Sequence, residues 1–337
     1  MPTATALPAV STTFNGVNTP RTRLRTALLA AIMATATLAG CSASPDTTSD
    51  TATSSQASTP VDIAVPTPQV TLTNPGTGDL RAVRYVDLGA TQQVPVTVGL
   101  GFAQNTGTDL STEPAPNGDG VVLTATASAT VDQGADATTS RQVTLTLTDV
   151  TRDDPALDVS VANGLTSTLG ISGTGIIGTV SFTPPAGVAT DPDTADPTQA
   201  EALGTVEGYL SALYGQMVIF PEDPIGDGAT WTVDMPVLGE SSTLQTTTYT
   251  LMSREGDTVT VRAEVAQRPA VTSLPVGDGS GQSLSISSTH STGSGTFTVD
   301  LTKPLPSTMD FSVATRIIYG EGNTTRVAQD TWQTTRI

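Results

Sequence analysis

Apolar and polar side chains alternate with a period of two over most of the chain beyond residue 120. The alternation runs through residues 121–131, 143–147, 157–161, 231–237, 259–265 and 309–319, with apolar side chains at most odd positions and mainly threonine, serine or charged residues between them. This period is typical of β-strands that bury one face, because successive side chains of a strand point to opposite sides. The pattern therefore predicts long antiparallel strands that share one apolar face.

Two features of the pattern predict how the strands are connected. Residues 117–120 (NGDG) and 254–257 (REGD) carry turn-forming residues next to alternating runs, so we expect a meander of hairpins. The parity of the apolar positions also changes, since Leu284 and Ile286 are even whereas Phe297 and Val299 are odd. A slip of one residue turns the buried face of a strand outward, which predicts a bulge or sharp bend near residues 293–295 (GSG).

One helix is predicted between the strands. Asp196 is a suitable N-cap, and Pro197 suits the first helical position, where its missing N–H is not needed. The helix then places its large apolar side chains on one stripe, at Leu203, Val206, Leu210, Leu213, Tyr214 and Met217. This stripe has two interpretations: it fills the core beneath the sheet, or it lines a cavity for an apolar ligand.

Together these elements predict a mainly β fold, in which about ten or more strands form a large curved antiparallel sheet or half-barrel with one central α-helix. We expect residues 67–337 to form this β-rich domain. Residues 41–66 consist mainly of serine, threonine, alanine, proline and aspartate. Such a composition buries too little apolar surface to order a chain, so we predict a flexible stalk, with or without attached sugars.

The start of the chain has the layout of an export signal. Three arginines, Arg21, Arg23 and Arg25, precede an apolar run over residues 27–38, and small residues separate that run from the only cysteine of the chain. The run is too short to span a bilayer, which needs about 20 apolar residues. We therefore expect residues 1–40 to be a signal peptide that is removed.

Leu38, Ala39, Gly40 and Cys41 resemble the lipobox of bacterial lipoproteins. The resemblance implies that a signal peptidase recognises the first three residues and cleaves before Cys41, which carries diacylglycerol. Two or more acyl chains hold a protein stably on a membrane. We expect a lipid-anchored protein on the extracytoplasmic face of the cell membrane; the alternative is an ordinary signal peptide with an incidental cysteine.

The charge of the chain narrows the choice of partners. The formal net charge is −18, and the predicted signal peptide contains basic residues but no acidic ones, so the mature chain is more acidic still. This charge excludes nucleic acid as a natural partner, because phosphates would be repelled. It also argues against docking on anionic headgroups, which leaves the lipid anchor as the contact with the membrane.

No motif indicates catalysis, a cofactor or a metal. Residues 173–178 (GTGIIG) match the spacing of a dinucleotide-binding loop, but strand-forming residues follow where a helix would have to begin. His290 is the only histidine, no G-x-S-x-G nucleophile motif is present, and the acidic clusters do not complete a calcium loop. We expect a protein that is not an enzyme.

Two strings carry a family resemblance. Residues 221–231 have the pattern P-x-x-P-I-G-x-G-A-x-W and begin after the predicted helix, and residues 293–306 read GSGTFTVDLTKPLP. With the helix, they resemble an uncharacterised family of actinobacterial lipoproteins, a domain of unknown function, over roughly residues 90 to 320. The resemblance implies a secreted, lipid-anchored β-rich domain and assigns no catalytic residues.

Two functions fit these observations. The first is a cell-envelope lipoprotein that binds an apolar ligand or envelope lipid beneath the helix stripe. The alternative is a non-enzymatic structural module that contacts proteins or glycans at the cell surface. A cavity under the helix would favour the first function, and a packed interior would favour the second. The oligomeric state, the ligand and the partner stay open.

Overall fold

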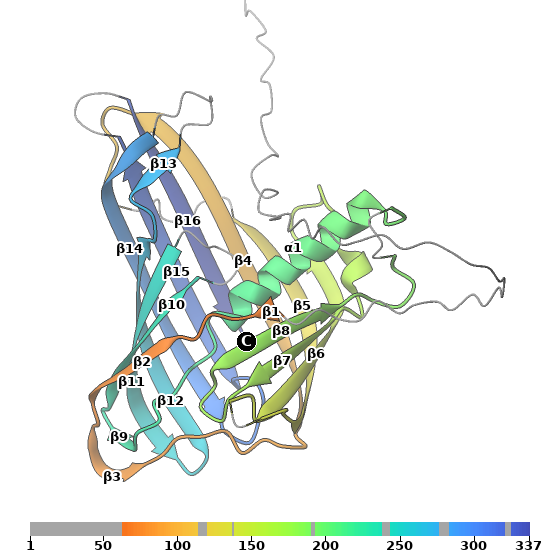
Figure 1. Ribbon diagram of the computed structural model, residues 1–337, viewed down its shortest axis with the longest axis vertical. Coiled ribbons are helices and arrows are strands. Elements are labelled where there is room, and N and C mark those ends of the chain that lie inside the picture. Colours follow the sequence, from red (N-terminus) through yellow and green to blue (C-terminus); the bar gives the residue numbers. More distant parts are fainter. Residues whose placement is uncertain are drawn as a thin grey trace, which may run out of the picture. The chain divides into compact units, whose positions relative to one another are not determined.

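A computed structural model describes residues 63–113, 120–136, 138–189, 193–237, 243–275, 283–320 and 325–337 (Figure 1). The predicted signal peptide, lipobox and most of the predicted stalk lie outside these residues, as do residues 117–119 of the turn predicted at residues 117–120. The described chain begins with a strand at residue 63, inside the range predicted as stalk. Within the described residues no helix is both long and apolar enough to cross a bilayer.

In the part of the chain that the structure describes, the fold is mainly β, as predicted, with one α-helix, α1 (Pro197–Tyr214), and a short 3₁₀ turn, η1 (Ser160–Ala162). The strands are β1 (Ile63–Ala64), β2 (Gln69–Asn74), β3 (Thr77–Arg81), β4 (Thr91–Gly107), β5 (Val121–Gln133), β6 (Arg141–Arg152), β7 (Thr166–Ile171), β8 (Ile177–Thr183), β9 (Ile225–Asp227), β10 (Thr230–Pro236), β11 (Thr243–Glu255), β12 (Thr258–Pro269), β13 (Ser273–Pro275), β14 (Ser283–Asp300), β15 (Thr308–Tyr319) and β16 (Arg326–Arg336).

The strands form one large antiparallel sheet in the order β1-β8-β7-β6-β5-β4-β16-β15-β14-β12-β11-β10-β2, while β13 pairs with β14 and β3 pairs with β9. Neighbours in this order are mostly neighbours in sequence, so the predicted meander is confirmed. The central pair is an exception, because β4 pairs with the final strand β16, where Trp332 lies opposite Gly101. The two edge pairs, β1 with β8 and β2 with β10, are also distant in sequence. The ladder between β4 and β16 thus joins the early hairpins, formed by β4 to β8, to the late hairpins, formed by β10 to β16.

The two edge strands of the sheet are consecutive in the sequence. β1 pairs with β8 and β2 pairs with β10, and only residues 65–68 connect β1 to β2. Pro66 and Pro68 have no N–H to donate in this connection, which suits proline to a place where strand pairing stops. We call residues 65–68 the seam. The sheet is curved but does not close into a barrel.

One face of the sheet, which we call the inner face, packs against α1 (Figure 1). The predicted alternation is confirmed there: Leu123, Val143, Trp231, Val261 and Phe311, at the predicted inward positions of five strands, are each at most 2% exposed. The burial of several such side chains, at about 25 cal/mol per Å² of apolar surface, is the main stabilising contribution to the fold. The core is continuous beneath the helix.

The helix begins as the sequence predicts. The Asp196 carboxylate accepts hydrogen bonds from the backbone N–H groups of Thr198, at 2.8 Å, and of Gln199, at 3.2 Å, and Pro197 occupies the first turn. These bonds satisfy donors that have no partner within a helix. Gly204 and Gly208 are exposed, with no neighbouring atoms near the position of a β-carbon. These two glycines therefore face solvent, whereas the stripe of large apolar side chains faces the sheet.

Residues 83–90, the closing segment, cross one end of the inner face. Their backbone N–H groups bond to three separate strand ends, from Tyr85 to Gly173 at 2.9 Å, from Val86 to Leu301 at 2.8 Å and from Gly89 to Val131 at 2.9 Å. The side chains alternate: Val83, Tyr85 and Asp87 are buried, while Val86 and Leu88 are exposed. The segment thus ties the early and late hairpins together.

A buried ion pair holds the closing segment in place. Arg141 Nε donates to Asp87 Oδ1 at 2.7 Å, and Arg141 Nη2 bonds the other carboxylate oxygen. The guanidinium also lies over the Tyr85 ring, 4.1 Å from its centroid. Such a bidentate pair is well formed for a buried site, where an unpaired charge would be costly. Burial raises the pKa of Tyr85 to about 12.

Two predictions about strands were wrong. The register shift of β14 lies between Ile286 and Ser288, whereas pairing with β15 is regular through residues 293–295. The glycines there serve close packing instead, because a β-carbon on Gly293 or Gly295 would come within 3.0 Å of neighbouring side chains. Residues 157–161 do not continue as a strand either; Asp158 Oδ1 accepts from the Ser160 N–H at 2.9 Å and supports the turn that leads into η1.

The string of residues 221–231 has a structural role, consistent with its turn-forming residues. Its Gly226 approaches the turn at residues 75–77 so closely that a β-carbon would lie 2.2 Å from the Thr77 carbonyl oxygen. Gly228 has a φ of +73°, a conformation that favours glycine. Trp231, fully buried, donates its indole N–H to the Ile219 carbonyl at 2.8 Å. The hairpin predicted at residues 254–257 is confirmed between β11 and β12.

Candidate functional site

The six side chains predicted to line an apolar cavity lie in one hydrophobic core. Leu203, Val206, Leu210, Leu213, Tyr214 and Met217 are between 0% and 7% exposed. Met217 lies just beyond the end of the helix. The structure brings the six residues together, as predicted, but packs them against the inner face. In this conformation the stripe fills the core.

Hydrogen bonds fix the helix against the sheet on both sides of the stripe. Tyr209 donates its hydroxyl to the Val121 carbonyl at 2.8 Å, and the Tyr214 hydroxyl pairs with Ser167 Oγ on β7. Burial raises the pKa of Tyr214, so its hydroxyl stays protonated and available as a donor. A helix held by several buried polar contacts is part of the folded core.

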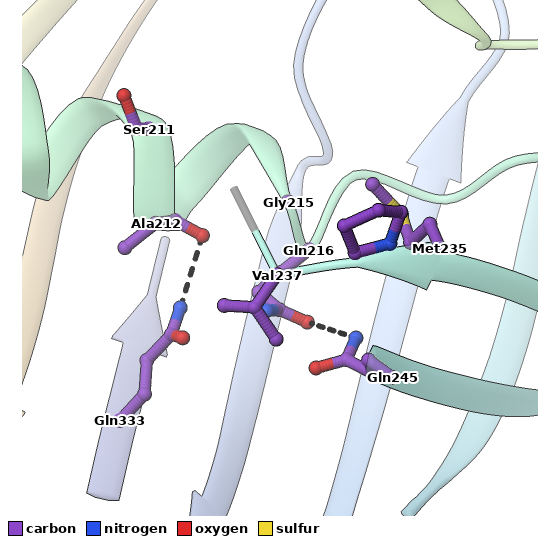
Figure 2. A pocket seen from close by; sticks show the side chains of 9 residues that line it. Ser211, Ala212, Gly215, Gln216, Met235, Val237, Gln245 and Gln333 are labelled. Atoms are coloured by element: carbon purple, nitrogen blue, oxygen red, sulfur yellow. Dashed lines mark hydrogen bonds between the residues drawn. The ribbon is translucent and has the colours of Figure 1, made fainter. Parts of the chain in front are cut away.

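Two small hollows border the end of the helix. The first has a volume of about 210 Å³, including space open to solvent, and is lined by the last turn of α1, the end of β10, Gln245 and Gln333 (Figure 2). The second measures about 290 Å³ on the same basis and lies at the seam, where Val65 and Pro68 face Met217 and Met235. Neither has the size of a closed cavity for an acyl chain.

The inner face changes character at the end of the helix. Strands β11, β12, β14, β15, β16 and β4 continue past this point (Figure 1), and their inward positions carry amides and hydroxyls in place of aliphatic groups. We call the first set of these side chains the polar row. Its members, in sheet order, are Gln245, Gln267, Ser291, Thr315 and Thr331.

Hydrogen bonds connect the polar row to the helix and to itself. Gln245 Nε2 donates to Gln216 Oε1, just after the helix, at 3.4 Å (Figure 2), and Gln267 Nε2 donates to Gln245 Oε1 at 3.0 Å. The Thr315 hydroxyl donates to Gln267 Oε1 at 2.7 Å, and Ser291 Oγ accepts from the Gln267 N–H at 2.8 Å. Because Gln267 is held on both sides, its amide has a fixed orientation.

A further glutamine marks the boundary between the apolar and polar parts. Gln333, on β16, is 7% exposed, and its Nε2 donates to the Ala212 carbonyl in the last turn of α1 at 2.9 Å (Figure 2). The carbonyls of the last helical turn have no partner within the helix. Gln333 therefore caps the helix from the sheet.

The polar row leads to an exposed group of side chains on the two central strands. Phe102 on β4 lies opposite Thr331, and Gln104 lies opposite Gln329 on β16, all on the inner face. Phe102 is 56% exposed, and Gln329 Nε2 donates to Gln104 Oε1 at 3.1 Å. We call these four residues the β4/β16 patch. Because β5 pairs with β4 only as far as Leu100, this part of β4 has no β5 partner beside it.

The opposite face of the same strands carries a buried ion pair. Arg316 donates to both oxygens of Asp330 at 2.6 Å and to the Ser111 carbonyl at 2.9 Å, which holds residues 108–113 over this face. The hydrogen bonds to Asp330 raise the pKa of Arg316. His290, half-exposed on β14, lies 3.1 Å from a Glu113 carboxylate oxygen and is an ordinary strand residue.

The other sequence motifs are not brought together into a site. Residues 172–176 form a turn that leads into β8, in which Ser172 Oγ accepts from the Ile176 N–H at 3.0 Å. No helix follows that could present its N-terminus to a phosphate. Within the described ranges, no three histidine, cysteine, aspartate or glutamate side chains gather to hold a metal ion.

Compared with known proteins, the chain matches no family model and no curated protein sequence. Sequence reasoning missed the polar row because it searched for apolar stripes and reactive groups. A signal was present: the period-two alternation of β11, β12, β15 and β16 continues into positions occupied by glutamine and threonine, such as Gln245, Gln267 and Gln329. Where a strand carries polar residues on both of its faces, that part of the strand extends beyond the apolar core.

Proposed function

We propose that the chain is a membrane-anchored lipoprotein of a bacterial cell envelope, whose folded domain is a non-enzymatic interaction module. Support for the anchor comes from the lipobox-like residues that end at Cys41, preceded by a short apolar run and three arginines. The acidic charge of the chain is compatible with tethering by acyl chains and not by headgroup contacts. The resemblance to actinobacterial lipoproteins points the same way.

The observation that carries the interaction module is the packing of the predicted cavity lining. Leu210 is 3% exposed and Leu213 is fully buried, so the helix stripe acts as core. A protein with a filled interior recognises partners on its surface, and the β4/β16 patch is an exposed, uncharged part of that surface. None of the five side chains in the polar row is an acid, a base or a thiol, which favours binding over catalysis.

The mass of the mature N-terminal peptide tests the anchor. We expect a peptide that begins at Cys41 and carries two or three acyl chains, and a Cys41→Ser variant that is found outside the membrane fraction. Protein recovered from culture fluid with an unmodified thiol, or full-length protein inside the cell, would contradict the proposal.

Photo-crosslinking on intact cells tests the interaction module. A photoreactive side chain at Phe102 should give discrete adducts with envelope components, whereas the same group at Leu88, which is similarly exposed at 55% on the closing segment, should give few. Equal labelling from both positions would argue against a specific surface at the β4/β16 patch.

A carrier of apolar ligands is the second candidate, favoured by the hollow at the seam. Val65, Pro68 and Ile177 give it an apolar lining, and it borders Tyr214 and Met217 of the predicted stripe. A ligand could enter if the seam separated from the inner face. Native mass spectrometry of protein extracted from its own membrane tests this function: a co-purifying lipid that is lost in a Met217→Asp variant would support the carrier.

A further inference from the structure

Among the described residues, the inward positions beyond the helix carry no charged side chain. Next to the polar row lies a second set of inward positions, occupied in sheet order by Thr243, Pro269, Thr289, Ile317, Gln329 and Gln104. None of these side chains, and none in the polar row, is ionisable, although the chain contains 46 charged residues by its composition of 14 basic and 32 acidic groups. The charged residues of the same strands, such as Arg268, Arg316 and Asp330, occupy the alternate positions.

This absence of charge limits the ligand that the face can recognise. An anionic or cationic ligand would find no counter-charge among these inward positions and would lose hydration without compensation. A purely apolar ligand would bury the remaining amide groups, Gln104 Nε2 and Gln329 Oε1, without partners, which is also costly. The chemistry that fits is a neutral molecule with many hydroxyl groups, because amides both donate and accept hydrogen bonds.

The β4/β16 patch supplies the two elements of such recognition side by side. The bond from Gln329 to Gln104 uses one donor and one acceptor, which leaves Gln104 Nε2 and Gln329 Oε1 to face a ligand. Phe102 lies two residues before Gln104 on the same face and exposes more than half of its surface. An exposed aromatic ring offers a flat apolar surface on which the C–H face of a sugar ring can stack.

The spacing of the face also suits a chain of sugars. Adjacent strands lie about 4.8 Å apart, close to the length of one hexose unit, so neighbouring strands can present side chains to successive units. The Gln267 amide, which is hydrogen-bonded to Gln245 and to the buried hydroxyl of Thr315, keeps the adjoining part of the face in one conformation. A preorganised face loses less entropy on binding.

We propose that the β4/β16 patch, supported by the neighbouring polar row, binds an uncharged oligosaccharide, which stacks on Phe102 and is hydrogen-bonded by Gln104 and Gln329. This inference rests on the proposed function, since it names the class of partner that the interaction module recognises. The ligand lies along the inner face across β4 and β16.

The test is an array of oligosaccharides, neutral and charged, probed with the mature chain in detergent and followed by calorimetry on the neutral hits. We expect saturable binding to one or more neutral glycans at concentrations up to about 10 mM, a range that detects millimolar affinities. Phe102→Ala should weaken binding about tenfold, and Gln329→Met should weaken it about three- to tenfold.

Matched variants control for effects unrelated to the patch. Leu88→Ala removes an equally exposed apolar side chain at the other end of the inner face, and Gln142→Met removes an exposed amide on β6. Both should bind the glycan as the unaltered protein does. Circular dichroism and thermal unfolding of every variant establish that the fold is retained.

Three outcomes would overturn the inference: no neutral glycan binds, charged glycans bind equally well, or binding survives both Phe102→Ala and Gln329→Met. The proposed function fails separately. A chain that is acylated at Cys41 and crosslinks from position 102 to envelope proteins, but binds no glycan, would retain the interaction module and reject this ligand.

Discussion

The two ends of the inner face share the long strands β4, β11, β12, β14, β15 and β16 but differ in the side chains and segments that cover them. At one end the closing segment crosses the sheet, buries the Arg141–Asp87 pair and completes a chain of aromatic contacts from Tyr85 through Phe220 to Trp231, each with ring centroids 6.0 Å apart. At the other end the strands run past the helix and present glutamine and threonine. The inward side chains of the closing segment are buried at the first end, whereas Phe102 and Gln104 are exposed at the second.

This difference separates the residues that stabilise the fold from those that are available for binding. At the closed end Arg141 and Asp87 are buried and paired with each other, so removing one leaves the other buried and unpaired. At the polar end Phe102 and Gln104 remain exposed, and their loss leaves no cavity. We therefore expect substitutions to change stability near the helix and the closing segment, and to change binding at the β4/β16 patch.

The largest effect should come from a charge placed beneath the helix. Leu210→Asp would bury an unpaired carboxylate at a position that is 3% exposed, and we expect a loss of more than about 4 kcal/mol of unfolding free energy, enough to prevent stable folding. Urea unfolding followed by tryptophan fluorescence measures it. A folded Leu210→Asp protein would show that the helix can leave the core, as the carrier function requires.

Breaking the ion pair at the closed end should cost nearly as much. Arg141→Met leaves the Asp87 carboxylate buried without its partner, which typically destabilises a protein by about 3–5 kcal/mol. The double variant Arg141→Met, Asp87→Leu should recover much of this loss, because it removes both charges. Equal stability of the single and double variants would contradict the buried pairing.

At the boundary between the two parts, the effect should be smaller. Gln333→Leu removes the donor to the Ala212 carbonyl at the end of α1 and should lower the unfolding free energy by about 1–2 kcal/mol. Hydrogen exchange of the amides in the last turn of α1 should increase in this variant. Unchanged exchange would mean that Gln333 does not cap the helix.

The closed end should also be the more sensitive to acid. Hydrogen bonds from the Thr302 hydroxyl and N–H lower the pKa of Asp300, next to the residue that accepts the Val86 N–H bond. A lowered pKa in the folded state means that the contribution of Asp300 is complete above the unfolded pKa of about 3.9 and is lost as the pH falls through the folded pKa. The stability difference from Asp300→Asn, measured as Tm against pH, should therefore be constant at neutral pH and shrink as the pH falls below about 3.9.

The smallest effect on stability is expected at the β4/β16 patch. The double variant Gln104→Met, Gln329→Met replaces both partners of an exposed pair, so the unfolding free energy should change by less than about 0.5 kcal/mol. A fall of about 2 kcal/mol or more would show that the patch is part of the core architecture, and the contrast between the two ends would be lost.

Much of the fold could be predicted because its signals are local. The alternation of residues 121–131 and 259–265, the cap at Asp196 and the turn at residues 254–257 each depend on neighbours in sequence. The position of the bulge in β14 was predicted wrongly, because a change in the parity of apolar residues shows that a strand contains a register shift but not at which residue. The ladder between β4 and β16 joins residues more than 200 positions apart and has no local signal.

The candidate site was harder to predict for the same reason. The helix stripe was identified correctly as a buried surface, but a buried stripe has the same pattern whether it meets a ligand or a sheet. The polar row and the neighbouring Phe102 bring together side chains from six strands, and their spacing in sequence carries no period. Only the register of the sheet aligns them.

The seam determines how the domain would respond to a mechanical load. A pull on the chain before residue 63 acts first on β1, which is held by two residue pairs with β8 and by the bond from the Val65 N–H to the Gly178 carbonyl at 3.0 Å. These few bonds would rupture one after another, as in unzipping, before the load reached the longer β2. In a tethered protein of this design, β1 would detach under tension and lengthen the connection to the membrane, while the helix and the central strands stayed folded.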